Sequence, residues 1–391
     1  MKLDLSNKQL SGSIPTSLGE LTNLTSLYLC NKNLSSTIPK EIGKLKSLVE
    51  LILSKNQLNS SIPTSLGYLP QHICYSGQLK NLSVSDNHLT GPIHKSLKTC
   101  KSLFRVRLEG NQLTGNISKD FGVYPNLDFI DMSHDKLYGE IIQKWVQCSK
   151  IKTLLIARNN LTGSIHPEIV NSYKIHELDL SSNHLVGVIP KGFGRMTSLQ
   201  KLYHLDLSSN KFNASIASSL GDFLKLYHLS LSNIHFSQRI PFKLEKLVQL
   251  NELDLSHNSL EGSIPPENSN MESLQTLNLS NNNLLGFIPS SLEGMHSLSY
   301  VDVSYNELEG PLPNIRAFRQ ALPEALQGNK GLCGNVEGLQ PCTRGSRKDR
   351  KRVFGITFSL IATIILLSVF FTIKFLVERK KKHPIVFSFK F

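Results

Sequence analysis

The sequence predicts an α/β solenoid: a superhelix of stacked repeats with a parallel concave β-sheet, followed by a single transmembrane helix. Two observations predict it. A hydrophobic frame recurs thirteen times in residues 1–313, and a segment of 21 residues near the C-terminus carries no charged side chain. A frame repeated at a fixed period is the signature of a solenoid. A charge-free stretch of about 20 apolar residues is long enough to cross a bilayer as a helix.

Thirteen copies of the frame are in register, and most lie 24 residues apart. The clearest are LDLSNKQLSGSIP from Leu3, LILSKNQLNSSIP from Leu51 and LDLSHNSLEGSIP from Leu253. Ten of the twelve spacings are 24 residues; the exceptions are 31 residues after the third copy and 27 after the eighth. We interpret these two as scars of lost repeats, with simple surface insertions as an equal alternative. The central aliphatic residues are Leu3, Leu27, Leu51, Leu82, Val106, Ile130, Leu154, Leu178, Leu205, Leu229, Leu253, Leu277 and Val301.

Each copy predicts a short strand followed by a turn. Two aliphatic residues two positions apart lie on one face of the strand and point into the core. An asparagine three residues later can hydrogen-bond the backbone where the strand turns away, so a buried polar side chain is tolerated there. It occurs nine times, at Asn56, Asn87, Asn111, Asn159, Asn183, Asn210, Asn258, Asn282 and Asn306, and is replaced by Lys8, Lys32, Asp135 and Ile234. Because isoleucine makes none of these bonds, we expect local loosening near Ile234.

The sequence GSIP at residues 12–15 and 262–265 supports a narrower resemblance. Its glycine permits a tight bend before a second extended piece. With this LxGxIP extension the repeats resemble the plant-specific class of leucine-rich repeat, found in receptor-like kinases, receptor-like proteins and polygalacturonase inhibitors. The resemblance covers roughly residues 1–343 and is closest to the male-discoverer-interacting receptor-like kinase group. It implies a leucine-rich repeat superhelix with added twist.

We predict five segments along the chain. Residues 1–313 hold the repeats, 314–343 resemble the C-terminal cap of plant receptor ectodomains, 344–352 form a basic juxtamembrane linker, 353–373 the transmembrane helix and 374–391 a short cytoplasmic tail. A cap is expected because the last repeat would otherwise expose its core. Both flanks of the span are basic, so charge alone does not orient it. The family resemblance places the repeats outside the cell, on the plasma membrane.

The net charge of +13 lies mostly at one end of the chain. The last 51 of the 391 residues hold twelve Lys and Arg against two acidic residues, so the first 340 are close to neutral. A nucleic-acid-binding surface would need its basic residues on the folded part, so nucleic acid is not an expected partner. The charge instead lies beside the predicted transmembrane helix, next to anionic lipid headgroups.

The six cysteines are predicted to differ in role. Cys333 and Cys342 fall in the segment that resembles the receptor cap, and we expect a disulfide between them, which implies an oxidising compartment. Cys100 and Cys148 occupy matching inward positions two repeats apart, so strand spacing separates them by about 10 Å. That exceeds the limit of about 7 Å between the Cα atoms of a disulfide. The cysteines expected to be unpaired are Cys30, Cys74, Cys100 and Cys148.

Several parts of a receptor kinase are missing from the sequence. We find no signal peptide, no N-terminal cysteine-bearing cap, and no Gly-rich loop, VAIK-type lysine or HRD triplet. The DFG at residues 120–122 is coincidental, because Phe121 falls on a core position of the frame. The chain is therefore not expected to be an enzyme, and we predict no catalytic residue, cofactor or metal site.

The first candidate ligand-binding patch is an Arg-x-Arg pair on a predicted strand. Val106 points inward, so Arg105 and Arg107 project from the concave face, where paired guanidinium groups suit a carboxylate. Several plant peptide receptors resemble this, because they hold the free C-terminus of a peptide with such a pair. The alternative is two solvated arginines that answer nearby carboxylates such as Glu109.

The second candidate patch is His176, Tyr203, His204, Tyr227 and His228. The segments KLYHLDLS and KLYHLSLS repeat Tyr and His in two columns of the predicted sheet. Exposed aromatic residues favour peptide contact, and the histidines could make that contact pH-sensitive. Duplication of one ancestral repeat explains the likeness equally well.

Eight N-x-S/T sequons occur in the chain. Asn81 and Asn278 lie on predicted strands and are the poorer glycan candidates. The predicted glycosylation sites are Asn23, Asn33, Asn59, Asn116, Asn160 and Asn213.

Three functions compete at this stage. The first is a single-pass plasma-membrane receptor-like protein that binds an extracellular peptide or protein ligand. It would signal through a partner co-receptor kinase or as part of a receptor-like kinase. The second is a defence protein like the polygalacturonase inhibitors, which the transmembrane span disfavours because those inhibitors are soluble. The third is a non-functional truncated fragment of a receptor kinase.

Overall fold

The computed structural model describes residues 1–6, 8–61, 78–93, 97–141, 145, 147–166, 175–190 and 202–342. The chain divides into two compact units, Met1–Gln340 and Pro341–Phe391, and the first holds every described helix and strand. The predicted linker, transmembrane helix and tail lie outside the described residues. Within the described residues, no helix is long and apolar enough to cross a membrane.

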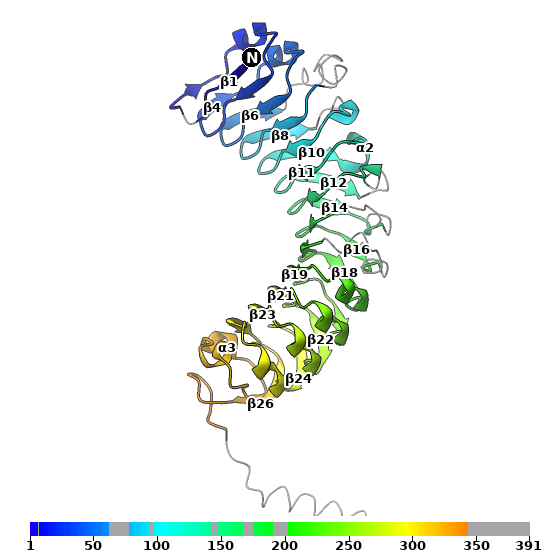
Figure 1. The fold of residues 1–391 in the computed structure, drawn as a ribbon, viewed down its shortest axis with the longest axis vertical. Coiled ribbons are helices and arrows are strands. Elements are labelled where there is room, and N and C mark those ends of the chain that lie inside the picture. Colours follow the sequence, from blue (N-terminus) through cyan, green and yellow to red (C-terminus); the bar gives the residue numbers. More distant parts are fainter. Residues whose placement is uncertain are drawn as a thin grey trace, which may run out of the picture. The chain divides into compact units, whose positions relative to one another are not determined.

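All thirteen predicted strands form one parallel sheet, in sequence order, along the concave side of the first unit (Figure 1). The register pairs the central aliphatic residue of each strand with that of the next, including across the two long spacings. The predicted frame is therefore confirmed in every copy. The strands are β1 (Lys2–Asp4), β3 (Ser26–Tyr28), β5 (Glu50–Ile52), β7 (Asn81–Ser83), β9 (Arg105–Arg107), β11 (Phe129–Asp131), β13 (Thr153–Leu155), β15 (Glu177–Asp179), β17 (His204–Asp206), β19 (His228–Ser230), β21 (Glu252–Asp254), β23 (Thr276–Asn278) and β25 (Tyr300–Asp302).

A second layer of short parallel strands follows the asparagine turns and falls into three sheets. The first contains β2 (Ser11–Gly12), β4 (Asn33–Ser36), β6 (Gln57–Ser61), β8 (His88–Pro92), β10 (Gln112–Asn116), β12 (Lys136–Glu140) and β14 (Asn160–Thr162). The second pairs β16 (Val186–Gly187) with β18 (Lys211–Phe212). The third contains β20 (Ser237–Gln238), β22 (Ser259–Gly262), β24 (Asn283–Phe287), β26 (Glu307–Pro311) and β27 (Gly331–Cys333).

The break between β18 and β20 flanks Ile234, the position where loosening was expected. Ile234 is fully buried, and the concave sheet continues past it. Ala214 and Gln238 stand where other copies have the bend glycine, and both adopt positive φ (79° and 67°). Isolated bonds cross the break, such as the one from Ser237 N–H to the Ala214 carbonyl (3.0 Å). The interruption is therefore confined to the second layer.

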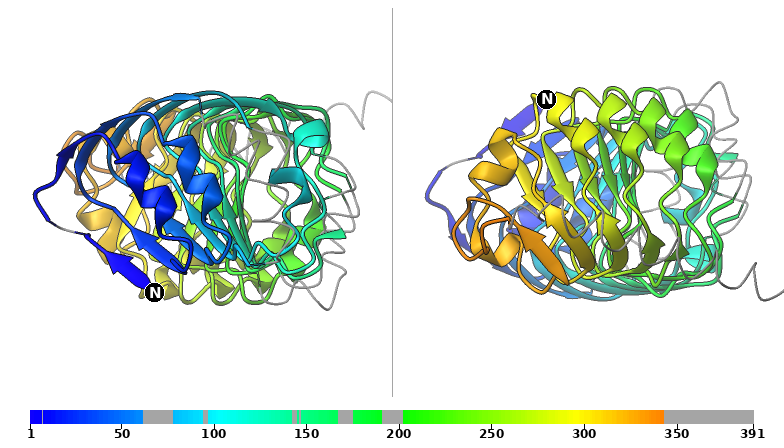
Figure 2. Two further views of the ribbon diagram at one scale, coloured as in Figure 1. Left: turned by 90° about the horizontal axis from the view of Figure 1, so that it is seen from above. Right: turned by 90° about the horizontal axis from the view of Figure 1, so that it is seen from below.

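Short helical turns complete the repeats, and several begin directly after a proline, which cannot donate to a preceding carbonyl. Seen along the stack, strands and turns surround one interior (Figure 2). The turns are η1 (Thr16–Glu20), η2 (Lys40–Lys44), η3 (Leu97–Thr99), α2 (Ile117–Asp120), η8 (Ser218–Asp222), η9 (Phe242–Lys246), η10 (Pro266–Asn270), η11 (Ser290–Gly294), α3 (Arg316–Arg319) and η12 (Pro323–Ala325).

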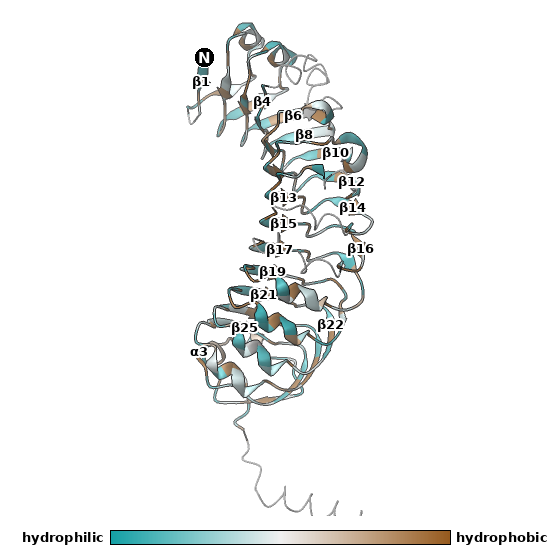
Figure 3. Cartoon of the chain, turned by 45° about the vertical axis from the view of Figure 1, so that its right-hand side comes forward, coloured by the Kyte–Doolittle hydropathy of each residue, from teal (hydrophilic) through white to brown (hydrophobic). Residues whose placement is uncertain are grey.

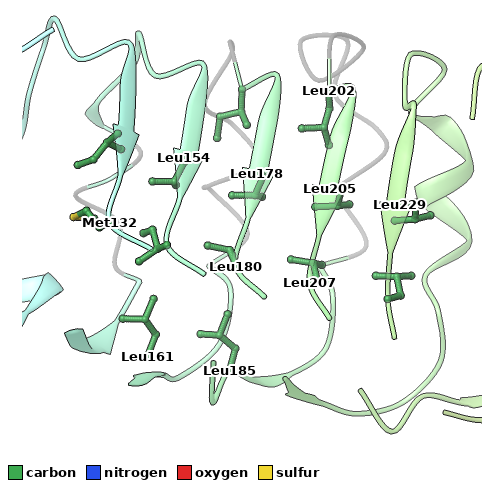
Figure 4. Close-up of a cluster of buried hydrophobic side chains, with 14 of the residues drawn as sticks. Met132, Leu154, Leu161, Leu178, Leu180, Leu185, Leu202, Leu205, Leu207 and Leu229 are labelled. Atoms are coloured by element: carbon green, nitrogen blue, oxygen red, sulfur yellow. The ribbon is translucent and has the colours of Figure 1, made fainter. Parts of the chain in front are cut away.

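The interior is a continuous stack of aliphatic side chains. Leu154, Leu178, Leu205 and Leu229 follow one another from strand to strand, all nearly inaccessible to solvent (Figure 4). Hydrophilic and hydrophobic positions are interspersed along the same strands and turns (Figure 3). Burial of one such leucine contributes about 2 kcal/mol, so the stack is the main source of stability.

The frame asparagines form a hydrogen-bonded ladder through the stack, as predicted. Asn183 shows the pattern: its Nδ2 donates to the carbonyls of Leu180 (3.1 Å) and Ser181 (3.1 Å) in its own repeat and of Ile156 (2.9 Å) in the preceding one. Its Oδ1 accepts the N–H of Leu161 (3.0 Å). Each asparagine therefore links two consecutive repeats.

Residues after β25 cover the end of the aliphatic stack. Helix α3 buries Ala317 and Phe318. Asn329 continues the ladder, because its Nδ2 donates to the carbonyls of Val303 (3.0 Å) and Leu326 (2.9 Å). Strand β27 then pairs with β26 in the second layer.

The cysteines differ in part from expectation. Cys333 and Cys342 are each disulfide-bonded. Cys100 is disulfide-bonded as well, so the prediction of an unpaired thiol there is wrong. The argument from strand spacing excluded only Cys148 as the partner of Cys100. It did not apply to Cys74, which falls in the 31-residue repeat and lies outside the described residues. Cys148 is buried, and burial raises the pKa of its thiol.

Gly221 marks a place where two repeats approach too closely for a side chain. A Cβ on Gly221 in η8 would overlap the carbonyl oxygen of Lys243 in η9. Gly221→Ala is therefore expected to lower the free energy of unfolding by about 2–3 kcal/mol in urea denaturation. Gly294→Ala is the control, because nothing lies within 4 Å of a Cβ there. Equal stability of the two variants would contradict this account of the packing.

Candidate ligand-binding surface on the concave sheet

The concave sheet presents two outward columns of side chains. In β3 to β25 the central residue of each strand is buried, so the first and third residues face out. Strand pairing aligns these residues across the whole sheet. Any ligand lying along the repeats would meet these two columns in order.

A cavity of about 380 Å³ opens on the N-terminal part of this surface, between β3 and β9. Its charged lining is entirely cationic: Lys55, Arg105 and Arg107. Asn81 and Ser83 add polar groups from β7. The thiol of Cys30 also lines it, with Sγ 3.1 Å from the hydroxyl of Ser6. Asn81 Nδ2 already donates to Glu50 (2.8 Å), and the hydroxyl of Ser83 is hydrogen-bonded to that of Ser54, so it is the cationic side chains of the cavity that suit an anionic group.

The structure places both predicted arginines at this cavity, where they differ in exposure and in their contacts. Arg105 is exposed, and its guanidinium carbon lies 3.8 Å from the ring centroid of Phe129 on β11. This stacking leaves the N–H groups at the guanidinium edge available. Within the described part of the chain, no carboxylate pairs with Arg105. Arg107 is half exposed and forms an ion pair with Glu109.

A group of buried carboxylates lies close to Arg107; the sequence named Glu109 and Asp131 as alternative partners of the arginines but did not predict that they are buried. Glu109, Asp131 and Asp135 are each more than nine-tenths buried. Burial raises the pKa of Glu109 and of Asp131, and the Asp131 charge raises that of Glu109 further. Burial raises the pKa of Asp135 to about 8. The signal was Asp135 itself, an acid in a frame position that otherwise calls for asparagine.

The predicted Tyr and His patch is also assembled on the concave face. The rings of His204 and His228 stack with centroids 4.4 Å apart and planes 10° apart. His228 Nδ1 lies 2.9 Å from a carboxylate oxygen of Glu252. Tyr203 donates to Glu177 (3.1 Å), and Tyr227 is 53% exposed.

The histidines of this patch are half-buried, whereas its two tyrosines are exposed. Burial lowers the pKa of His204, and the neighbouring His228 lowers it further. His176, the first residue of the patch, is half-buried on the N-terminal side of β15. The patch is therefore a partly desolvated surface with two exposed tyrosines at its edge.

The predicted glycan sites lie mostly on exposed positions. Asn23, Asn33, Asn59, Asn160 and Asn213 are exposed. Asn116 is half-buried, and its Oδ1 accepts the backbone N–H groups of Ser118 (3.0 Å) and Lys119 (3.2 Å) as the N-cap of α2.

Family comparison agrees with this geometry. Leucine-rich repeat matches lie at residues 23–45, 47–69, 78–100, 174–196, 201–223 and 248–308. The matched segments are leucine-rich repeats. The curated relative MDIS1-interacting receptor like kinase 2 of Arabidopsis thaliana is 47% identical over 60 residues, which is 14% of this chain and 6% of that protein.

Two solved plant receptors resemble these leucine-rich repeats over most of the chain. The first is the ectodomain of the membrane receptor kinase GASSHO1/SCHENGEN3 from Arabidopsis thaliana, in complex with CASPARIAN STRIP INTEGRITY FACTOR 2. It has a TM-score of 0.72 and 32% identity, over 88% of this chain and 42% of that one. The second is the peptide hormone receptor RGFR1 in complex with RGF2, with a TM-score of 0.75 and 30% identity, over 86% and 52%. The chain thus spans about half or less of the length of these proteins.

Proposed function

We propose that the chain is the ligand-binding part of a single-pass plasma-membrane receptor whose concave sheet binds an extracellular peptide. The cationic cavity carries this proposal, because Lys55, Arg105 and Arg107 surround a concave space of about 380 Å³. The similarity to a peptide hormone receptor solved with RGF2 supports it.

The cavity would hold the free C-terminal carboxylate of the peptide. Arg105 offers a guanidinium oriented by Phe129, which suits bidentate contact with a carboxylate. Lys55 adds positive charge at the same opening, and Arg107, which is ion-paired with Glu109, lines it as well. Asn81 Oδ1, which has no hydrogen-bond partner among the described residues, can accept an N–H from the last peptide groups of the ligand.

The signal would leave through another protein or domain. The proposed arrangement has the repeats outside the cell, the disulfide of Cys333 and Cys342 beside the membrane, and residues 353–373 across it. A partner co-receptor kinase, or a kinase of the same receptor, would transmit binding to the cytoplasm.

The test is a binding experiment with the purified full chain. A pool of randomised twelve-residue peptides with free C-termini is passed over the protein, beside the same pool with C-terminal amides, and bound peptide is quantified by mass spectrometry. The free-acid pool is expected to bind at least tenfold more than the amidated pool, and Arg105→Ala with Arg107→Ala to abolish the difference.

The matched control removes two exposed arginines elsewhere, Arg239→Ala with Arg319→Ala. This variant should retain the preference for free acids. Equal binding of the two pools by the unchanged protein would overturn the proposed function.

A further inference from the structure

We infer that the concave sheet binds a peptide of fixed charge order, with its carboxyl end at the cavity beside β9 and basic residues over β15 to β21. The inference rests on the proposed function, and adds the direction in which the peptide runs and the composition it must have. Its support is the unequal distribution of charge along the two outward columns.

The C-terminal half of the surface is acidic, and His204 and His228 are the basic side chains in its outward columns. From β15 to β25 the outward residues of the six strands include six carboxylates and no lysine or arginine. The carboxylates are Glu177, Asp179, Asp206, Glu252, Asp254 and Asp302. In β1 to β13 the same two columns balance three basic residues against three acidic ones. The surface therefore changes from a cationic cavity to an anionic strip along one direction.

The anionic strip contains two kinds of carboxylate, which differ in whether they are hydrogen-bonded to the backbone. The aspartates hold the turns: Asp179, for example, accepts the backbone N–H of Ser181 at 2.9 Å. The two glutamates make contacts only with side chains, since Glu177 accepts from Tyr203 and Glu252 meets His228. Glu177 and Glu252 can thus turn toward a ligand without disturbing the backbone.

Crowding of like charge supports a cationic ligand. Burial raises the pKa of Asp206, and the charge of Asp179 raises it further. A lysine or arginine over these strands would relieve that repulsion. Tyr203 (45% exposed), Tyr227 and Tyr300 (48% exposed) line the same strip and can pack against the aliphatic stem or charged head of such a residue.

Strand spacing fixes where the basic residues must lie in the peptide. Adjacent strands are about 4.8 Å apart, so Glu177 on β15 lies about 14 Å from β9 and Glu252 on β21 about 29 Å. An extended chain advances about 3.3 Å per residue, which places the basic side chains about four to nine residues before the C-terminus.

The experiment uses the free-acid peptide pool and sequences the bound fraction position by position. For the unchanged protein, Lys and Arg are expected to be enriched about threefold to tenfold at positions four to nine before the C-terminus. Glu177→Gln with Glu252→Gln should remove most of that enrichment, while binding still depends on the free carboxylate. The matched control, Glu261→Gln with Glu309→Gln, changes exposed glutamates of the second layer and should keep the enrichment.

The outcomes separate this inference from the proposed function. Carboxylate-dependent binding with no basic preference, or with a preference unaffected by the two concave glutamates, overturns the charge order alone. A reversed preference, with acidic residues at those positions, overturns it as well. Binding that ignores the carboxylate contradicts the proposed function, and this inference falls with it. A thermal melt of each variant confirms that the fold is retained.

Discussion

Asp135→Asn is expected to raise the free energy of unfolding by about 2–3 kcal/mol at pH 8. Asp135 occupies a ladder position, where its Oδ1 accepts the N–H of Leu113 (2.7 Å). Its Oδ2 is buried and has no donor among the described residues. An asparagine would instead offer an Nδ2 to the carbonyls of the turn, as Asn111 does to Leu108 (2.7 Å) in the preceding repeat.

The gain should depend on pH in a defined sense. Burial raises the pKa of Asp135 to about 8, only partly offset by the Leu113 hydrogen bond, and the charges of Glu109 and Asp131 raise it further. An unfolded aspartate titrates near 3.9, so between about pH 4 and 8 the native state binds more protons. The stability of the unchanged protein therefore falls as pH rises through this window.

Urea denaturation at pH 4, 6 and 8 checks the prediction. The stability of Asp135→Asn should fall less over this range than that of the unchanged protein, with a residual slope from Glu109 and Asp131. Asp302→Asn is the control, because Asp302 caps a turn on the outward face through the N–H of Ser304. A loss of stability at pH 8 in Asp135→Asn would contradict our account of this carboxylate.

Asn183→Ala is expected to lower the free energy of unfolding by about 3 kcal/mol. The substitution leaves the buried carbonyls of Ile156 and Leu180 and the N–H of Leu161 without their side-chain partner. The measurement is chemical denaturation at neutral pH. Asn23→Ala is the control, since Asn23 is exposed on a turn, and should change stability by less than about 0.5 kcal/mol. Similar losses in the two variants would show that the ladder contributes little.

Most of the fold could be predicted because each repeat carries the same pattern of aliphatic residues and, in most copies, the same asparagine. The alternation around Val106 placed Arg105 and Arg107 outward, and the spacing of the aliphatic residues set the register of every concave strand. Ile234 was misread in part, because its side chain simply joins the core. The absence of an asparagine at position 234 did not predict the break in the second layer between β18 and β20.

The features that could not be predicted depend on bonds and turns outside the regular strand pattern. The disulfide at Cys100 could not be predicted from strand spacing, which was applied only to the pair Cys100 and Cys148. Lys55 reaches the cavity from the turn after β5, where its φ is 56°, so the alternation of the strand does not apply to it. Glu109 lies in the turn after β9 and is buried there, whereas the sequence indicated it only as an alternative partner of the arginines.

The interrupted second layer has a mechanical consequence. The resistance of a stack of repeats to bending depends on both of its layers, the concave sheet and the second layer. Regular strand pairing of the second layer stops between β14 and β16 and again between β18 and β20. Single backbone hydrogen bonds, such as Val186 N–H to the Gly163 carbonyl (2.8 Å) and Ser237 N–H to the Ala214 carbonyl (3.0 Å), still join the repeats there, so these two places are expected to bend more easily than the paired stretches. The cationic cavity lies before both places and Glu252 after them. Flexure there would alter the span between the two ends of the proposed peptide footprint, so ligand length and solenoid curvature become coupled quantities.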